Sequence, residues 1–153
     1  ININPGYIDN INENKKFDLI SFWDVLEHVT DLDKTLIKVE KISKKNAYLI
    51  VNVPDNDSFA CKLMGKKWPF YLNVHLYYFD KKSLEKLLEK HKFKLIKSFS
   101  HWQYLSLGYV LMRGSKYIGF LKYFEKIFKF LKLSNISVPY NMGQTTFIFE
   151  KSE

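Results

Sequence analysis

Short apolar runs in the first part of the chain alternate with apolar residues at helical spacing. The run at residues 19–23 predicts a buried strand of the kind found at the centre of a parallel sheet. Residues 32–42 carry an apolar residue at every third or fourth position and predict a helix. Residues 47–53 predict a second buried strand, which Pro54 ends because proline cannot donate to a sheet ladder. Together these elements predict a right-handed βαβ unit.

Further strands and a helix are expected after a long connection at residues 54–79. Asp80 is a candidate N-cap for a helix over residues 81–91. Strands are expected at residues 93–99 and 145–150. The pattern thus predicts an α/β fold with four strands, three or more helices and one open sheet edge.

The long connection is rich in aromatic side chains, which argues against disorder. Its large residues are Trp68, Phe70, Tyr71, Tyr77, Tyr78 and Phe79, together with Met64 and His75. This composition suits the lining of a pocket for a flat or apolar acceptor. The alternative is a lid that packs on the core, and Tyr78 and Phe79 are expected to belong to the core.

Residues 102–133 are predicted to form a helical insertion before the last strand. Large apolar residues recur there at helical spacing: Tyr117, Leu121, Phe124, Phe128 and Leu131. Lysines alternate with them at positions 116, 122, 126, 129 and 132. Such a helix suits peripheral contact with a membrane surface, or with a partner, through residues 116–132. The alternative is an ordinary helix that packs on the sheet and has a solvated lysine face.

Three ionisable side chains, Asp24, Glu27 and His28, follow the first predicted strand directly. Open α/β sheets bind their ligands outside the carboxyl ends of the strands. The sequence therefore predicts the rim of a site at this position. A solvated loop with a single helix-capping residue is the alternative.

A series of short motifs resembles the C-terminal half of class I S-adenosylmethionine (SAM)-dependent methyltransferases. In chain order the motifs are Phe17-Asp18-Leu19-Ile20, Asp24-Val25-Leu26-Glu27-His28, Val53-Pro54-Asp55, Lys67-Trp68-Pro69, His75-Leu76-Tyr77-Tyr78-Phe79 and Ser83-Leu84 with Leu87-Leu88. The resemblance runs from about residue 6 to residue 99. It is strongest to the branch that contains ubiquinone-biosynthesis O-methyltransferases and many sugar or small-molecule methyltransferases.

The resemblance implies an incomplete doubly wound (Rossmann-like) methyltransferase sheet, forming the C-terminal portion of a single domain over residues 1–153. None of the six glycines forms the Gly-x-Gly-x-x-Gly turn of a nucleotide-binding loop, so we expect the glycine-rich cofactor half to be absent. The chain would then be a fragment, a module that pairs with another chain, or a degenerate homologue. We expect such a chain to bind SAM weakly by itself and to leave one sheet edge and one sheet face uncovered.

The resemblance also implies roles for particular side chains. Trp23, Asp24 and Val25 would lie beside SAM, with Ile8 as a candidate on the adenine side. His28 and His75 are the possible bases for an oxygen acceptor, although His75 could equally be satisfied by a backbone carbonyl. In the ubiquinone-type branch an acid-x-x-Glu-His run is associated with a divalent ion. A magnesium site at Asp24, Glu27 and His28 is therefore a further hypothesis, with simple hydrogen bonding as its alternative.

Charge and cysteine content narrow the classes of function. The net charge is +8, but 23 of the 24 basic residues are lysines, and nucleic-acid recognition favours arginine, so a nucleic-acid partner is not expected. The single cysteine excludes an internal disulfide. With no leader or long apolar run, we expect a cytoplasmic protein, with membrane association as a further hypothesis.

Two functional hypotheses follow from these observations. The first is SAM-dependent methylation, at oxygen, of a small-molecule, sugar or lipid-linked acceptor. The second is a non-catalytic interaction or membrane-surface module whose open sheet edge is covered by a second copy or by a partner chain.

Overall fold

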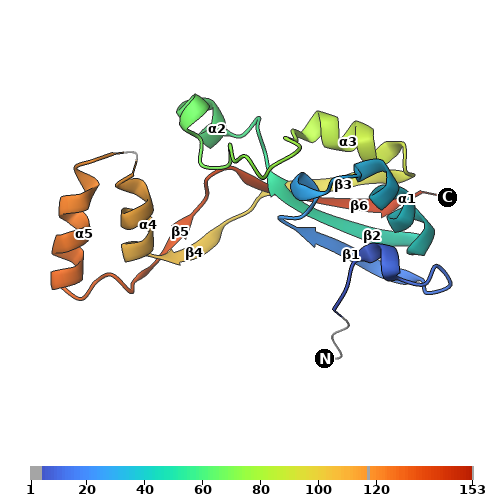
Figure 1. Ribbon diagram of the computed structural model, residues 1–153, viewed down its shortest axis with the longest axis horizontal. Coiled ribbons are helices and arrows are strands. Elements are labelled where there is room, and N and C mark those ends of the chain that lie inside the picture. The colour runs from blue at the N-terminus through green and yellow to red at the C-terminus, as the bar shows by residue number, and fades with distance from the viewer. Residues whose placement is uncertain (1–4, 117, 153) are drawn as a thin grey trace.

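A four-stranded sheet forms the body of the protein in the computed structural model, which describes residues 5–116 and 118–152. Its strands are β1 (Phe17–Trp23), β2 (Ser43–Pro54), β6 (Gln144–Lys151) and β3 (Phe93–Ser100), in that spatial order (Figure 1). β1 and β2 are parallel, and β6 runs antiparallel to both of its neighbours. The four expected strands are confirmed, and β1 and β3 are the two edge strands of this sheet. The segment at residues 1–4 lies outside the described residues.

Two helices, α1 (Leu32–Ile42) and α3 (Lys81–Glu89), pack on one face of this sheet. Leu36 and Leu88 meet Leu49 and Phe149 of the sheet in the main core cluster. Each helix has an aspartate N-cap, as expected for α3, because a carboxylate accepts from backbone N–H groups left free in the first turn. The buried side chains of both helices recur at the helical period, as the sequence pattern predicts.

The other face of the sheet is open. This agrees with the expectation of one uncovered sheet face, and it corrects the separate expectation that β1 is buried on both faces. Leu19 is 54% exposed and Trp23 is 50% exposed, whereas Phe22 on the helical face is buried. Tyr48 of β2 lies opposite Leu19 and is also exposed. An apolar run is typical of a strand buried on both faces, but none of the described helices packs on this second face.

Asn46 and Lys92, which follow α1 and α3 in the chain, adopt left-handed backbone conformations. Asn46 has φ 60° and Lys92 has φ 64°. β2 already begins at Ser43, four residues before the predicted start, so Asn46 lies within the strand. The left-handed conformation costs an ordinary side chain about 1–2 kcal/mol, and asparagine tolerates it better than lysine does.

The connection between β2 and α3 contains α2 (Phe59–Met64) and the 3-10 turn η3 (Gly65–Lys67). Trp68 anchors it, since its indole is buried and its Nε1 donates to the carbonyl of Met142 at 2.6 Å. Phe79 is buried as expected. Tyr78 is 38% exposed, which corrects its assignment to the core, because its ring lies over the connection itself and its hydroxyl donates to the carbonyl of Leu72.

Residues 103–140 form a separate arm that projects away from the sheet (Figure 1). Its elements are β4 (Gln103–Ser106), α4 (Leu107–Gly114), α5 (Leu121–Phe130) and β5 (Ser137–Tyr140), with β4 and β5 paired antiparallel. The prediction of a single amphipathic helix over residues 116–132 is wrong at its start, because α5 begins only at Leu121. Residues 118–120 form a bend and turn at Gly119, and Tyr117 lies outside the described residues.

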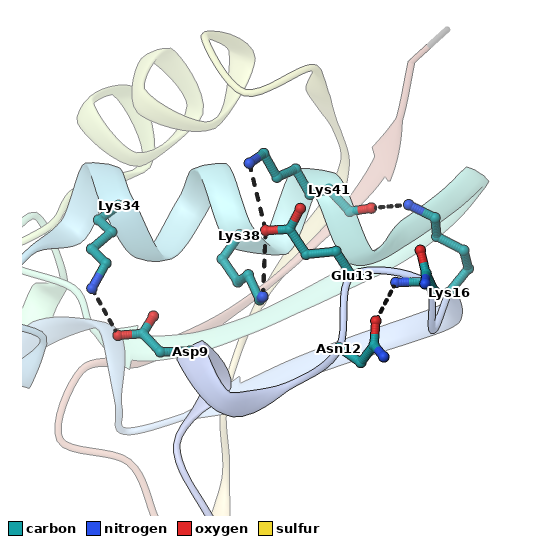
Figure 2. A network of polar contacts seen from close by, with 8 residues as sticks. Asp9, Asn12, Glu13, Lys16, Lys34, Lys38 and Lys41 are labelled. Carbon is teal, nitrogen blue, oxygen red and sulfur yellow. Dashed lines mark hydrogen bonds and ion pairs between the residues drawn. The ribbon is translucent and has the colours of Figure 1, made fainter.

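The segment before β1 is tied to α1 by exposed charges (Figure 2). The carboxylate of Asp9, in the 3-10 turn η1 (Ile8–Asn10), pairs with Lys34 at 3.0 Å. Glu13 pairs with both Lys38 and Lys41. These contacts hold η1 beside α1, so that Ile8 packs against the main core.

Candidate functional site

Asp24 lies at the carboxyl end of β1 in a left-handed conformation with φ 52°. Its N–H donates to the carbonyl of Asn52 at 3.0 Å, and its carboxylate accepts a hydrogen bond from the side-chain amide of Gln144. Asn52 in turn donates to Thr146. These bonds join the ends of β1, β2 and β6. Non-glycine residues in this conformation are often found at functional sites.

The 3-10 turn η2 (Leu26–His28) follows and holds a buried carboxylate, because Glu27 is only 1% exposed. The backbone carbonyl of Glu27 accepts from the N–H groups of Leu76 at 2.7 Å and Tyr77 at 3.3 Å. The connection between β2 and α3 is thereby held against η2. The two rings of His28 and His75 meet edge to face, with centroids 4.7 Å apart.

Burial controls the electrostatics of this group. It raises the pKa of the Glu27 carboxyl, and the nearby Asp24 carboxylate acts in the same direction. Burial lowers the pKa of the His75 imidazole, and His28 adds to this effect. Glu27 Oε2 and His75 Nδ1 are both buried with no partner in good hydrogen-bond geometry among the described residues, although the backbone of Phe70 interacts with His75 and acts to raise its pKa. Buried polar atoms without a partner are uncommon, so these two atoms call for an explanation such as a bound proton or cation.

Glu27, His28 and His75 each offer a ligand atom, and these atoms lie within 4.8 Å of one another. His28 Nδ1 lies 2.9 Å from the carbonyl of Val74, to which it donates in the tautomer that leaves Nε2 free as a ligand. Asp24 is not part of this group. The structure thus brings together two members of the predicted metal set and adds His75, which the sequence could not place beside them.

A cavity of about 440 Å³ opens between the tip of β1 and the arm. Asp24, Phe70 and Gln144 line one side of it. The arm contributes Gln103, Tyr104, Leu105, Ser106, Tyr109, Arg113 and Tyr140. His28 and His75 do not line the cavity. Asp24 does line it, and its carboxylate also acts to raise the pKa of His75. Asp24 therefore connects the cavity with the Glu27–His28–His75 group.

The predicted cofactor-binding residues differ in exposure. Trp23 and Val25 are exposed on either side of Asp24, and the Trp23 ring packs edge to face on His101. Ile8 is partly buried against the core. Sequence reasoning missed Gln144 and the lining residues of the arm. The only signal for them was Arg113, the single arginine of the chain.

The sheet has the order β1-β2-β6-β3, and its edge strand β1 runs parallel to β2 and ends in an acidic tip. This arrangement is that of a Rossmann-like α/β protein. Residues 6–98 match the methyltransferase-domain family, and the chain belongs to that family. The expectation drawn from the short motifs is confirmed at this level. No match is found among curated proteins.

Solved SAM-dependent methyltransferases share the fold. A Thermotoga maritima enzyme, described as a possible histamine N-methyltransferase, is 22% identical with a TM-score of 0.55, covering 96% of this chain and 62% of its own. An Archaeoglobus fulgidus SAM-dependent methyltransferase is 14% identical with a TM-score of 0.53, covering 90% and 60%. Magnesium protoporphyrin IX methyltransferase from Synechocystis PCC 6803, with bound S-adenosylhomocysteine, is 11% identical with a TM-score of 0.51, covering 96% and 49%. The chain thus spans about half to two thirds of their lengths.

Proposed function

We propose that the protein transfers a methyl group from SAM to an oxygen of a small-molecule, sugar or lipid-linked acceptor. The observation that carries this proposal is the cavity of about 440 Å³ between Asp24 and the arm. It begins at the carboxyl end of β1, where open α/β sheets bind ligands. Its size and its mixture of aromatic and polar side chains suit a small organic acceptor.

Trp23, Asp24 and Val25 are the residues that would hold the cofactor. Two exposed apolar side chains flank a carboxylate, which fits a ligand that carries both a flat ring and hydroxyl groups. Ile8 has less free surface and contributes less. SAM brings a methyl group that its sulfonium already activates. The residues of this chain then have to orient the acceptor and exclude water.

His75 is the proposed proton acceptor for a hydroxyl nucleophile, and His28 supports it. The lowered pKa keeps the His75 ring neutral near pH 7, which is the form that accepts a proton. Because His75 does not line the cavity, we expect the proton to reach it through water or after closure of the connection between β2 and α3.

Methyl-transfer assays on the full-length protein test this role, with a panel of phenols and sugars as acceptors and release of S-adenosylhomocysteine as the signal. His75→Ala should lower turnover by about 100-fold or more. Tyr78→Phe is the control, because Tyr78 packs near His75 but the change removes only a hydroxyl. A change of less than about threefold in His75→Ala would remove the proposed role of His75.

A divalent ion at Glu27, His28 and His75 is a second proposal for the same group. The unsatisfied Glu27 Oε2 and His75 Nδ1 favour it, since a cation would satisfy both atoms. Two imidazoles and one carboxylate suit zinc or another transition metal better than magnesium. Zinc titration of chelator-treated protein should show binding that Glu27→Gln abolishes, and unchanged binding would exclude the site.

For the non-catalytic alternative, we propose that a polypeptide segment or a second copy of the chain covers β1. The exposed Leu19, Trp23 and Tyr48 on the open sheet face favour it. Light scattering should then show association that Leu19→Ser weakens. A monomer with the same hydrodynamic behaviour in both forms would contradict this alternative.

A further inference from the structure

The arm presents a row of large apolar side chains on the outer face of α5. Phe120, Tyr123, Ile127 and Phe130 recur at helical spacing, and Phe130 is 86% exposed. Leu121 and Phe128, on the adjoining part of the helix surface, are partly buried, and Leu121 lies close to Gly114 of α4. The hairpin therefore uses only part of the apolar surface of α5. Between residues 103 and 140, none of the side chains whose exposure the structure describes, a set that leaves out Tyr117 and Lys122, is buried.

The same arm carries most of the excess positive charge of the chain. Residues 103–140 contain six basic residues and one acidic residue, a net charge of +5 out of +8. Lys126 and Lys129 are exposed on α5 itself, next to the apolar row. The surface thus combines aromatic side chains with lysines, which favours a partner that is both apolar and anionic.

We propose that the outer face of α5 docks on an anionic membrane surface, with Phe120, Tyr123, Ile127 and Phe130 among the lipid acyl chains and the lysines at the headgroups. α5 has 10 residues and is about 15 Å long, so it lies along the surface rather than across it. In the described parts of the chain, the helices all fall short of the length and apolarity that crossing a bilayer requires.

Charge and composition favour this partner over two others. A second copy of the arm would bring two surfaces of net charge +5 together, which opposes pairing through this face. Nucleic acid would be expected to meet more than one arginine. The docking does not depend on methyl transfer, so it is testable without an acceptor.

Flotation of the full-length protein with vesicles tests the apolar part of the surface. Binding should be strong to vesicles of phosphatidylcholine with phosphatidylglycerol and weak to phosphatidylcholine alone. Ile127→Ser with Phe130→Ser should lower binding by about tenfold or more, because two apolar side chains no longer enter the bilayer. Phe59→Ser is the matched control. Phe59 is 80% exposed on α2, which is not part of the arm, and its loss should leave binding unchanged (Figure 1).

A second pair of variants tests the charge. Lys126→Gln with Lys129→Gln should lower binding to the anionic vesicles by about 10- to 30-fold. Lys86→Gln with Lys90→Gln removes the same charge from the region of α3 and should have a much smaller effect. Added salt should weaken wild-type binding.

Four outcomes would overturn the proposal. They are absence of binding to anionic vesicles, equal binding to neutral vesicles, equal losses in the arm variants and their controls, and self-association that Phe130→Ser abolishes while vesicles are not bound. Circular dichroism spectra that match the wild type show that the variants fold. Exposed positions such as these tolerate substitution with little change in stability.

Discussion

Leu36, Leu49 and Phe149 are fully buried between the sheet and its helices, whereas the arm has partly or fully exposed residues at every described position. Both regions are rich in large apolar side chains. The sheet body uses them to stabilise itself, and the arm leaves many of them on its surface. Apolar content alone therefore does not identify a core, and the exposed apolar side chains of the arm are the basis of the membrane-docking proposal.

The largest expected effect comes from removing a side chain of the sheet body. Phe149→Ala should lower the free energy of unfolding by about 3–5 kcal/mol, because it leaves a cavity in the core. Phe130→Ala, the matched change on α5, should alter it by no more than about 0.5 kcal/mol. Urea unfolding of both variants measures the contrast. Equal losses would mean that the arm has a core of its own.

A smaller effect is expected from the buried Glu27 carboxyl. Its pKa is raised in the fold, so its contribution to stability is present at low pH and is lost as the pH rises through the folded pKa. Glu27→Gln should therefore match wild type below about pH 4 and be more stable near neutral pH by about 1–3 kcal/mol. Thermal unfolding at several pH values, with chelator present, checks this. Added zinc should reverse the sign if Glu27 is a metal ligand.

The smallest effect is expected at the surface of the sheet body. Asp9→Asn removes the exposed ion pair with Lys34 and should lower the free energy of unfolding by less than about 1 kcal/mol (Figure 2). The difference should disappear at about 1 M salt, since ions screen exposed pairs. A larger loss that persists in salt would show that η1 depends on this pair to hold Ile8 against the core.

The sheet body was predictable because its strands and helices follow simple periods. The capping box of Asp80 with Ser83 and the apolar spacing of α1 are local signals that need no knowledge of the partners. The exposure of Trp23 agrees with the uncovered sheet face expected from the missing cofactor half, whereas the apolar run of β1 alone indicated burial, because a local pattern does not show what covers each face. In the arm, β4 and β5 have only four residues each and carry no clear period.

The candidate site was predictable only in part, for a similar reason. Asp24, Glu27 and His28 lie within five residues of sequence, so a local pattern could indicate all three. Only Glu27 and His28 belong to the group of neighbouring ligand atoms. His75 joins them because the carbonyl of Glu27 binds the N–H groups of residues 76 and 77. Gln144 reaches Asp24 across 120 residues of sequence. Contacts of this kind depend on the tertiary fold and produce no regular spacing in the sequence from which they could be predicted.

The central claim is that the tip of β1 holds the cofactor, and calorimetric titration of the full-length protein with S-adenosylhomocysteine tests it most directly. Asp24→Gly removes the carboxylate while glycine accepts the left-handed backbone, so the strand end keeps its shape. Lys92→Gly makes the same backbone change outside the candidate site. We predict that Asp24→Gly weakens binding by about tenfold or more and that Lys92→Gly leaves it unchanged. Equal affinity in Asp24→Gly and wild type would contradict the account.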